Sequence, residues 1–174
     1  MSVKVLFTHS YFLKFDSKQY KTAMPYPPLG TLYAMAYLRE QGYEVKLFDT
    51  MFCNSAKEIE PIIDEFKPQI FISYDDCFNY LTKMCLTNMR EACFEMQQLA
   101  KSKNCFVITS SSDSTDHFEK YLQHGADAIA IGATMPNKEI AVYTNYDSKL
   151  VDFFALGTTQ ALLPTGTKVN VAGT

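Results

Sequence analysis

The fold follows from the stretch YPPLGTLYAMAYLREQGYEV, which spans residues 26–45. Pro27 and Pro28 fix φ near −65°, and a proline at or just before the first helical turn loses no needed hydrogen bond. Gly42 stands where the end of a helix requires a left-handed residue, and an apolar strand pattern follows directly. The segment therefore predicts a helix that returns into a strand, which is half of a parallel crossover. Its apolar stripe has the spacing i, i+3, i+4, i+7 and consists of Leu29, Leu32, Tyr33 and Ala36.

Strand and helix patterns alternate along most of the chain. The strand patterns cover residues 3–8, 44–48, 69–74, 105–110 and 128–132. The helical patterns between them cover 29–41, 59–66, 81–99 and 116–123, the last with Gly125 as its stop. Alternating strands and helices with short connections predict an α/β domain with a doubly wound, five-stranded parallel sheet, flavodoxin-like or Rossmann-like.

Two details of the second helical region bear on where its helix begins. Ser55 and Glu58 have the spacing of a capping box. Pro61 favours a helix that starts late or is kinked, because proline lacks a backbone N–H.

The last part of the chain has a different character. Residues 1–132 form the predicted α/β domain, and residues 133–174 form a C-terminal appendage rich in Thr, Gly and Pro near its end. Within the appendage the patterns favour a strand at 140–143, a short helix at 148–156 and an edge strand at 168–171. We expect either a docking appendage or a partly ordered end.

Composition excludes several classes of protein. The 174 residues (19.8 kDa) are 47% hydrophobic, enough for a full core. The formal charge of −3 and the lack of a basic block argue against a nucleic-acid surface. No apolar run approaches the ~20 residues that cross a bilayer. The N-terminus has no signal-peptide pattern, so we expect a cytoplasmic protein without membrane partners.

The cysteine pattern argues against a metal centre. None of the five cysteines forms a CxxC or a Cys/His cluster, so no metal-binding residues are expected. No CxxxCxxC occurs, and this triplet would be needed to hold a radical SAM iron–sulfur cluster. Cys85 and Cys93 are interpreted as small core residues.

Ligands of an open parallel sheet bind beyond the carboxyl ends of its strands. The serine-rich run 110–115 follows the fourth strand pattern and could cradle a phosphate or a flat ligand, or could simply be a capped loop. No G-x-G-x-x-G follows the first strand, and the acidic pair of a phosphoacceptor domain is missing there. His9, His117 and His124 support no catalytic triad, so we expect no catalytic residues.

Three segments together resemble a known family. They are the run 26–45, the passage EFKPQIFIS at 65–73, and the passage CFVITSSSD at 105–113 taken with Tyr121, Leu122 and GADAIAIG at 125–132. They are similar to the cobalamin-binding domain that precedes the catalytic domain in cobalamin-dependent radical SAM enzymes. The resemblance covers residues 3–132. It implies that cobalamin lies across the carboxyl edge of the sheet, with its nucleotide tail beside the fourth strand.

The resemblance also implies a set of cofactor contacts. Small side chains would make room for the tail, with Ser111 and Ser112 where many relatives have a Gly-Gly pair, Ser73 at the end of the third strand, and Gly132 at the end of the fifth. The cofactor-binding residues implied are Leu29, Gly30, Ser73, Tyr74, Ser110, Ser111, Ser112, Asp113 and Gly132. The D-x-H-x-x-G motif that supplies a histidine to cobalt is absent, since Phe12 follows His9 at the third position. We therefore expect no protein histidine on cobalt.

Three functions remain open from the sequence. The leading hypothesis is a cobalamin-binding module that is not an enzyme by itself and serves a radical SAM partner of the methyltransferase or cyclase type. The second is an interaction or regulatory domain that has kept the fold and lost the ligand. The third is a stand-alone enzyme that uses the serine-rich loop, for example on a phosphorylated metabolite.

Overall fold

The structure, a computed structural model, describes residues 2–25, 27–75, 87–109, 118–129, 131–134, 153–156, 158–162 and 168–172. The chain divides into two compact units, Met1–Ala128 and Ile129–Thr174. The division lies four residues before the predicted boundary at 132. The two units are described separately below.

The first unit is built on a parallel sheet. Its strands lie in the order β2 (Glu44–Phe48), β1 (Lys4–Thr8), β3 (Ile70–Ser73), β4 (Phe106–Thr109) and β5 (Ala128–Ile129). The pairs β1–β2, β1–β3 and β3–β4 are parallel. The predicted α/β class with a parallel sheet is confirmed.

The predicted fifth strand, 128–132, needs correction. Only the two residues of β5 join the edge of the sheet beside β4. Ile131–Thr134 form a separate strand, β6, which pairs in parallel with β7 (Phe153–Leu156) in the second unit. The sheet therefore has four strands of four or five residues and a two-residue edge.

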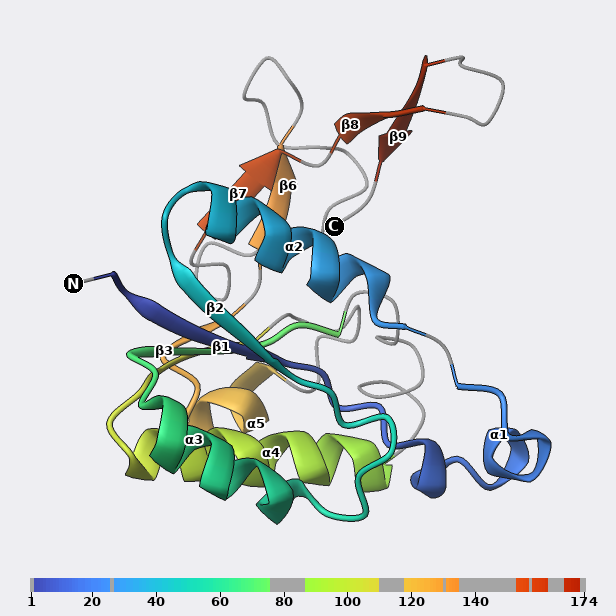
Figure 1. Ribbon diagram of the computed structural model, residues 1–174, viewed down its shortest axis with the longest axis vertical. Coiled ribbons are helices and arrows are strands. Elements are labelled where there is room, and N and C mark those ends of the chain that lie inside the picture. The colour runs from blue at the N-terminus through green and yellow to red at the C-terminus, as the bar shows by residue number, and fades with distance from the viewer. Residues whose placement is uncertain are drawn as a thin grey trace. The chain divides into compact units, whose positions relative to one another are not determined.

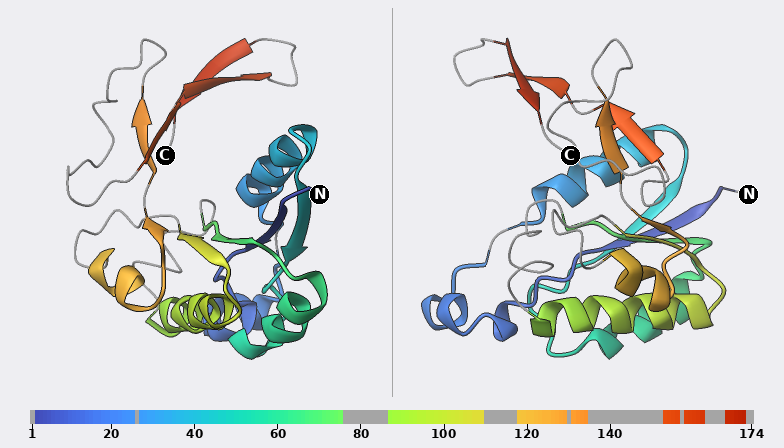
Figure 2. Two further views of the ribbon diagram at one scale, coloured as in Figure 1. Left: turned by 90° about the vertical axis from the view of Figure 1, so that its left-hand side faces the viewer. Right: turned by 180° about the vertical axis from the view of Figure 1, so that it is seen from behind.

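Helices cover both faces of this sheet (Figures 1 and 2). Helix α2 (Leu29–Glu40) lies on one face, and α3 (Glu60–Phe66), α4 (Thr87–Ser102) and α5 (Phe118–Gln123) lie on the other. The short 3₁₀ turn η1 (Leu13–Phe15) and helix α1 (Ser17–Thr22) follow β1. Within the described residues, no helix is long and apolar enough to cross a membrane.

The helix boundaries follow from the predicted signals. Pro28 is the N-cap of α2, and Gly42 follows its end with φ +88°. Ser55 and Glu58 form the predicted capping box, which starts the 3₁₀ turn η2 (Ala56–Ile59). Helix α3 begins only after this turn and holds Pro61 at its start, so the late start is confirmed. Gly125 has φ +98° just beyond α5.

The two faces of the sheet are covered to different extents. Leu6, Phe71 and Val107 are neighbours across three strands and are fully buried on the face of α3, α4 and α5. Thr8 and Ser73 point to the same face, since their side chains reach Met96 and Cys93 of α4. Cys93 is fully buried, as predicted, and Cys85 lies outside the described residues.

The opposite face, which carries α2, is well covered only over β1. There Val5 and Phe7 are buried. Their neighbours on β3 and β4 are half-buried or, for Phe106, 47% exposed.

Helix α2 presents a different stripe to the sheet from the predicted one. Thr31 is its buried residue, and Ala34, Met35 and Leu38 follow at helical spacing and are half-buried. The apolar stripe identified in the sequence lies on the outer side, where Leu29, Leu32 and Tyr33 are 53%, 39% and 76% exposed. Almost the whole helix is apolar, so periodicity could not tell which stripe faces inward.

The second unit is described only as strands. β6 pairs with β7, and β8 (Thr158–Leu162) forms an antiparallel pair with β9 (Lys168–Ala172). The strand predicted at 168–171 is confirmed. The helix predicted at 148–156 is wrong for residues 153–156, which form β7; aromatic pairs such as Phe153-Phe154 favour strands. The strand predicted at 140–143 lies outside the described residues.

Candidate functional site at the carboxyl edge of the sheet

The strand order defines one topological switch point. From β1 the chain passes to β2 on one side, and from β2 it crosses back to β3 on the other side of β1. The carboxyl ends of β1 and β3 therefore diverge into connections on opposite faces, which is where open α/β sheets bind their ligands. The residues at these two ends are His9, Ser10, Tyr74 and Asp75.

A buried carboxylate joins these two strand ends. Asp75 is fully buried, and its Oδ1 accepts a 2.5 Å hydrogen bond from the backbone N–H of Ser10. Its Oδ2 accepts hydrogen bonds from the hydroxyls of Ser10 (3.0 Å) and Ser73 (3.3 Å). The Ser73 hydroxyl also lies 3.3 Å from the sulfur of Cys93 on α4. Asp75 therefore links β1 to β3 where the two strands end.

His9 is held by partners on both ring nitrogens. The backbone N–H of Tyr11 donates to Nδ1 (3.3 Å), so Nε2 carries the proton and donates to Oδ1 of Asp49 (2.8 Å). The Thr50 hydroxyl lies 3.1 Å from Nδ1. The side chain is fully buried. Both ring nitrogens of His9 are therefore engaged within the chain.

Asp49 completes this arrangement on the β2 side. The hydrogen bond from His9 lowers the pKa of the Asp49 carboxyl, and the backbone N–H of Met51 adds to the effect. Partial burial opposes both. The carboxylate therefore stays ionised at neutral pH and orients the imidazole.

The structure brings together predicted cofactor residues from two distant segments. The hydroxyl of Thr31 donates to the carbonyl of Tyr74 (3.0 Å), which ties the first turn of α2 to the end of β3. Leu29 and Gly30 in that turn therefore lie near Ser73 and Tyr74 at the switch point.

The other predicted cofactor residues are not brought to this point. Ser110, Ser111, Ser112 and Asp113 lie outside the described residues, although they follow Thr109, which is the neighbour of Ser73 in the sheet. Gly132 lies within β6 in the second unit, opposite Phe154, and not at the end of the fifth strand of the main sheet.

The predicted cofactor residues did not include Ser10, Thr31, Asp49 or Asp75, which the structure places at the site. Ser10 and Asp75 each lie two residues beyond the end of a strand, and Thr31 lies in the first turn of a helix. The position of Asp75 and Ser10 after a strand was a usable signal. The hydrogen bond from Thr31 to Tyr74 could not be predicted, because a hydroxyl on an apolar helix does not indicate which distant group it will bond to.

Two of the described cysteines, Cys53 and Cys105, have thiols whose pKa is raised. Burial raises the pKa of the Cys53 thiol to about 11, with the carboxylates of Glu58 and Asp49 adding to the shift. Burial also raises the pKa of Cys105. Both thiols are thus protonated at neutral pH. Among the described residues there is no group of three or more His, Cys, Asp or Glu that could hold a metal ion.

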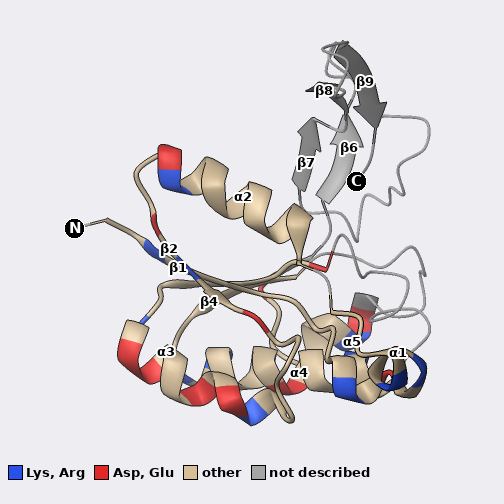
Figure 3. Ribbon diagram, turned by 45° about the vertical axis from the view of Figure 1, so that its right-hand side comes forward, with Lys and Arg blue, Asp and Glu red and all other residues tan. Residues whose placement is uncertain are grey.

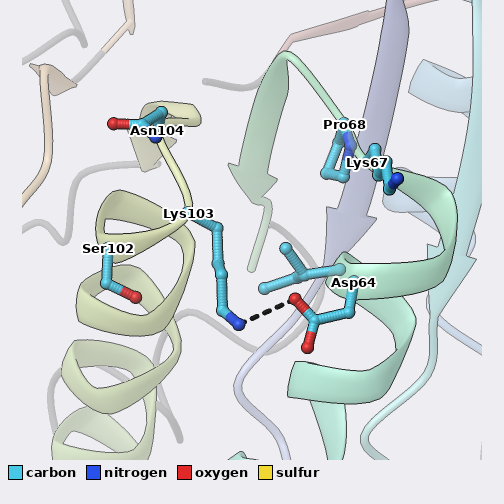
Figure 4. Close-up of a pocket in the computed structure, with 7 residues that line it drawn as sticks. Asp64, Lys67, Pro68, Ser102, Lys103 and Asn104 are labelled. Carbon is cyan, nitrogen blue, oxygen red and sulfur yellow. Dashed lines mark ion pairs between the residues drawn. The ribbon is translucent and has the colours of Figure 1, made fainter.

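A hollow of about 400 Å³ lies at the opposite edge of the sheet, between the C-terminal ends of α3 and α4 (Figure 4). Lys103 crosses it to Asp64 with an N–O distance of 2.7 Å and lies 3.5 Å from Glu60. The hydrogen bond to Asp64 raises the pKa of Lys103. Lysines near helix C-termini also complement the helix dipoles. We interpret this hollow as a gap beside the contact between the two helices and not as a ligand site. Ligands of such sheets bind at the other edge.

The chain was compared with protein families, curated sequences and solved structures. No model of a protein family and no curated protein sequence matches the chain. One solved structure, the crystal structure of TesA, is similar over 70% of this chain and 67% of its own, with 12% identity and a TM-score of 0.38. A similarity at this level supports no inference about function.

Proposed function

We propose that this chain is a cobalamin-binding module with a flavodoxin-like, or Rossmann-like, fold. It acts with a radical SAM partner of the methyltransferase or cyclase type and has no catalytic centre of its own. The strand order β2-β1-β3-β4-β5 supports the flavodoxin-like class, because that order defines it.

One observation carries the proposal. The hydrogen bond from Thr31 to Tyr74 gathers four of the residues that the family resemblance assigns to the cofactor, Leu29, Gly30, Ser73 and Tyr74, at the switch point. These residues come from segments more than forty positions apart, and the bond itself spans 43 positions. Their meeting at the expected edge of the sheet supports the assignment.

The residues at this edge fit a corrinoid held without a histidine. Gly30 has no side chain that would block a flat macrocycle, and the Ser73 side chain is turned toward Cys93 of α4, away from the face of Gly30. Both nitrogens of His9 are engaged, so His9 would not be expected to bind the cobalt of a bound corrinoid. Bound cobalamin would supply radical or group-transfer chemistry at cobalt. The chain would bind and orient the corrinoid and present one face of it to the partner.

The test is retention of a corrinoid by the purified chain. Protein mixed with hydroxocobalamin and passed through gel filtration should keep a coloured, shifted absorption spectrum. Ser112→Leu should abolish retention because the bulky side chain fills the space of the tail, while its circular dichroism stays native. Ser112→Gly is the matched control and should bind as the parent does. Equal retention by Ser112→Leu would place the tail elsewhere, and no retention by the parent would refute the proposal.

An interaction domain without the ligand is the second candidate. It is favoured by the bonds from Ser10 and Ser73 to Asp75, which already occupy the polar groups between β1 and β3. It is also favoured by the exposed apolar stripe on α2. The same experiment separates the two functions, since this candidate retains no corrinoid.

A further inference from the structure

Helix α2 carries an apolar surface that the other described elements of the first unit do not cover. Leu29, Leu32, Tyr33 and Tyr37 are 53%, 39%, 76% and 63% exposed and form one stripe along its outer side. The only charged residues of the helix are Arg39 and Glu40 at its C-terminal end, as Figure 3 shows. A helix that is apolar on both sides is normally buried on both sides. We call these four residues the α2 stripe.

On the same face, the sheet has an apolar surface over β3 and β4 that is incompletely covered. Parallel sheets are normally covered on both faces. Over β3 and β4, however, Phe106 is 47% exposed, and Ile70, Ile72 and Ile108 are half-buried. Neighbouring strands lie about 4.8 Å apart, so β3 and β4 with their flanks offer the width of about one helix. We call these four residues the open sheet face.

The two surfaces are complementary in kind. The α2 stripe is the side of a helix that packs on no sheet in the first unit, and the open sheet face is a sheet surface on which no helix of the first unit packs. Two copies related by a two-fold axis would place the α2 stripe of each on the open sheet face of the other. Such an interface is isologous and closes after two copies. The uncharged stripe brings no like charges together across the axis.

The area is sufficient for such a dimer. A large aromatic side chain buries ~150–250 Å², so Tyr33, Tyr37 and Phe106 at their exposed fractions contribute about 70–190 Å² each. With the aliphatic members of both surfaces, each copy offers on the order of 600 Å² of apolar surface, or roughly 1,200 Å² in total. Stable specific interfaces begin at about this size, whereas a monomer seldom exposes so large an apolar patch.

We propose that the chain forms a two-fold dimer in which the α2 stripe of each copy covers the open sheet face of the other. This inference goes beyond cobalamin binding and does not depend on it. The resulting arrangement has a shared helical layer between two parallel sheets. This single contact buries the exposed apolar surfaces of both elements.

The test is the mass of the full-length chain in solution. Sedimentation velocity over a concentration series, without corrinoid, should show a species of twice the 19.8 kDa monomer mass that dissociates on dilution. Tyr33→Lys and Phe106→Glu should each shift the dissociation constant upward by at least tenfold and keep native circular dichroism. Phe52→Lys is the matched control, because Phe52 is 73% exposed but lies outside both surfaces, and it should dimerise as the parent does.

Mixing the two variants distinguishes this contact from helix-to-helix pairing. A heterodimer of Tyr33→Lys with Phe106→Glu has one native contact and one contact with opposite charges, so the mixture should recover the dimer. A monomeric parent at all concentrations would overturn the proposal. A dimer unaffected by either substitution, or one not recovered on mixing, would do so as well.

Discussion

At the residue scale, the carboxyl edge of the sheet is organised by two buried polar arrangements. His9 and Asp49 connect the ends of β1 and β2, while Asp75 connects the ends of β1 and β3. Leaving a buried donor without its acceptor costs about 1–3 kcal/mol. These side chains therefore keep the ends of three strands in register at the edge where a ligand would bind.

Asp49 makes the stability of the fold depend on pH. Its pKa is lowered in the folded chain, so its contribution to the free energy of unfolding is present above its usual pKa near 4 and is lost as the pH falls through the lowered value. Asp49→Asn keeps an acceptor for His9 and Met51 but has no charge. We expect the parent to be more stable than this variant at pH 7, with the difference shrinking below about pH 4.

Urea denaturation at a series of pH values measures this difference. Asp49 is 42% exposed on its side chain, so solvent screening limits the effect, and the trend with pH is the decisive quantity. A difference that grew on acidification would contradict the assigned role of the His9–Asp49 hydrogen bond.

At the element scale, helices end where a left-handed residue stops them. Gly42 and Gly125 have φ of +88° and +98° after α2 and α5. Lys67 and Asn104 occupy the same kind of position after α3 and α4, with φ of +51° and +63°. The glycine stops were visible in the sequence, whereas the lysine and asparagine stops were not, because those residue types also occur inside helices.

Gly42→Ala isolates the backbone cost of such a stop. A Cβ at this position meets no atom within 4 Å, so any loss of stability comes from the left-handed conformation alone. We expect a loss of about 1 kcal/mol in the free energy of unfolding. At Gly125 the added Cβ would also lie 3.3 Å from the Lys101 side chain, so Gly125→Ala should cost at least as much. An unchanged melting temperature for Gly42→Ala would refute this account.

At the scale of the whole first unit, the sheet is asymmetric. The face toward α3, α4 and α5 is fully buried along Leu6, Phe71 and Val107, while the α2 face is open over β3 and β4. Two phenylalanines on neighbouring strands therefore have very different surroundings. Phe71 is fully buried and Phe106 is 47% exposed.

Truncating these two phenylalanines tests the asymmetry. Phe71→Ala should lower the free energy of unfolding by about 3–5 kcal/mol, because it leaves a cavity in the packed layer. Phe106→Ala should cost less than about 1 kcal/mol at dilute protein, where no dimer forms. Thermal or urea unfolding of the two variants side by side measures the contrast. Equal losses would mean that the α2 face is covered in the monomer.

The alternation of strands and helices, the parallel sheet, the glycine stops and the Ser55–Glu58 capping box were all determined by the sequence. Each depends on residues close together in the chain, whose spacing shows directly which backbone conformation they favour. The candidate site at the switch point was foreseen only in outline, as serines and small residues after strands. The partners of Thr31, His9 and Asp75 lie some forty to sixty-five positions away, and only the tertiary structure shows these pairs.

Tertiary structure alone also decided which side of α2 faces inward and how the fifth strand ends. Helix α2 is apolar nearly all round, so its periodicity is compatible with more than one orientation, and the hydrogen bond from Thr31 to Tyr74 selects one of them. The run 128–132 has one strand pattern in sequence, yet it divides between β5 and β6 because the two parts pair with different strands. Local patterns determine which elements form, whereas pairing between distant segments decides which surfaces meet.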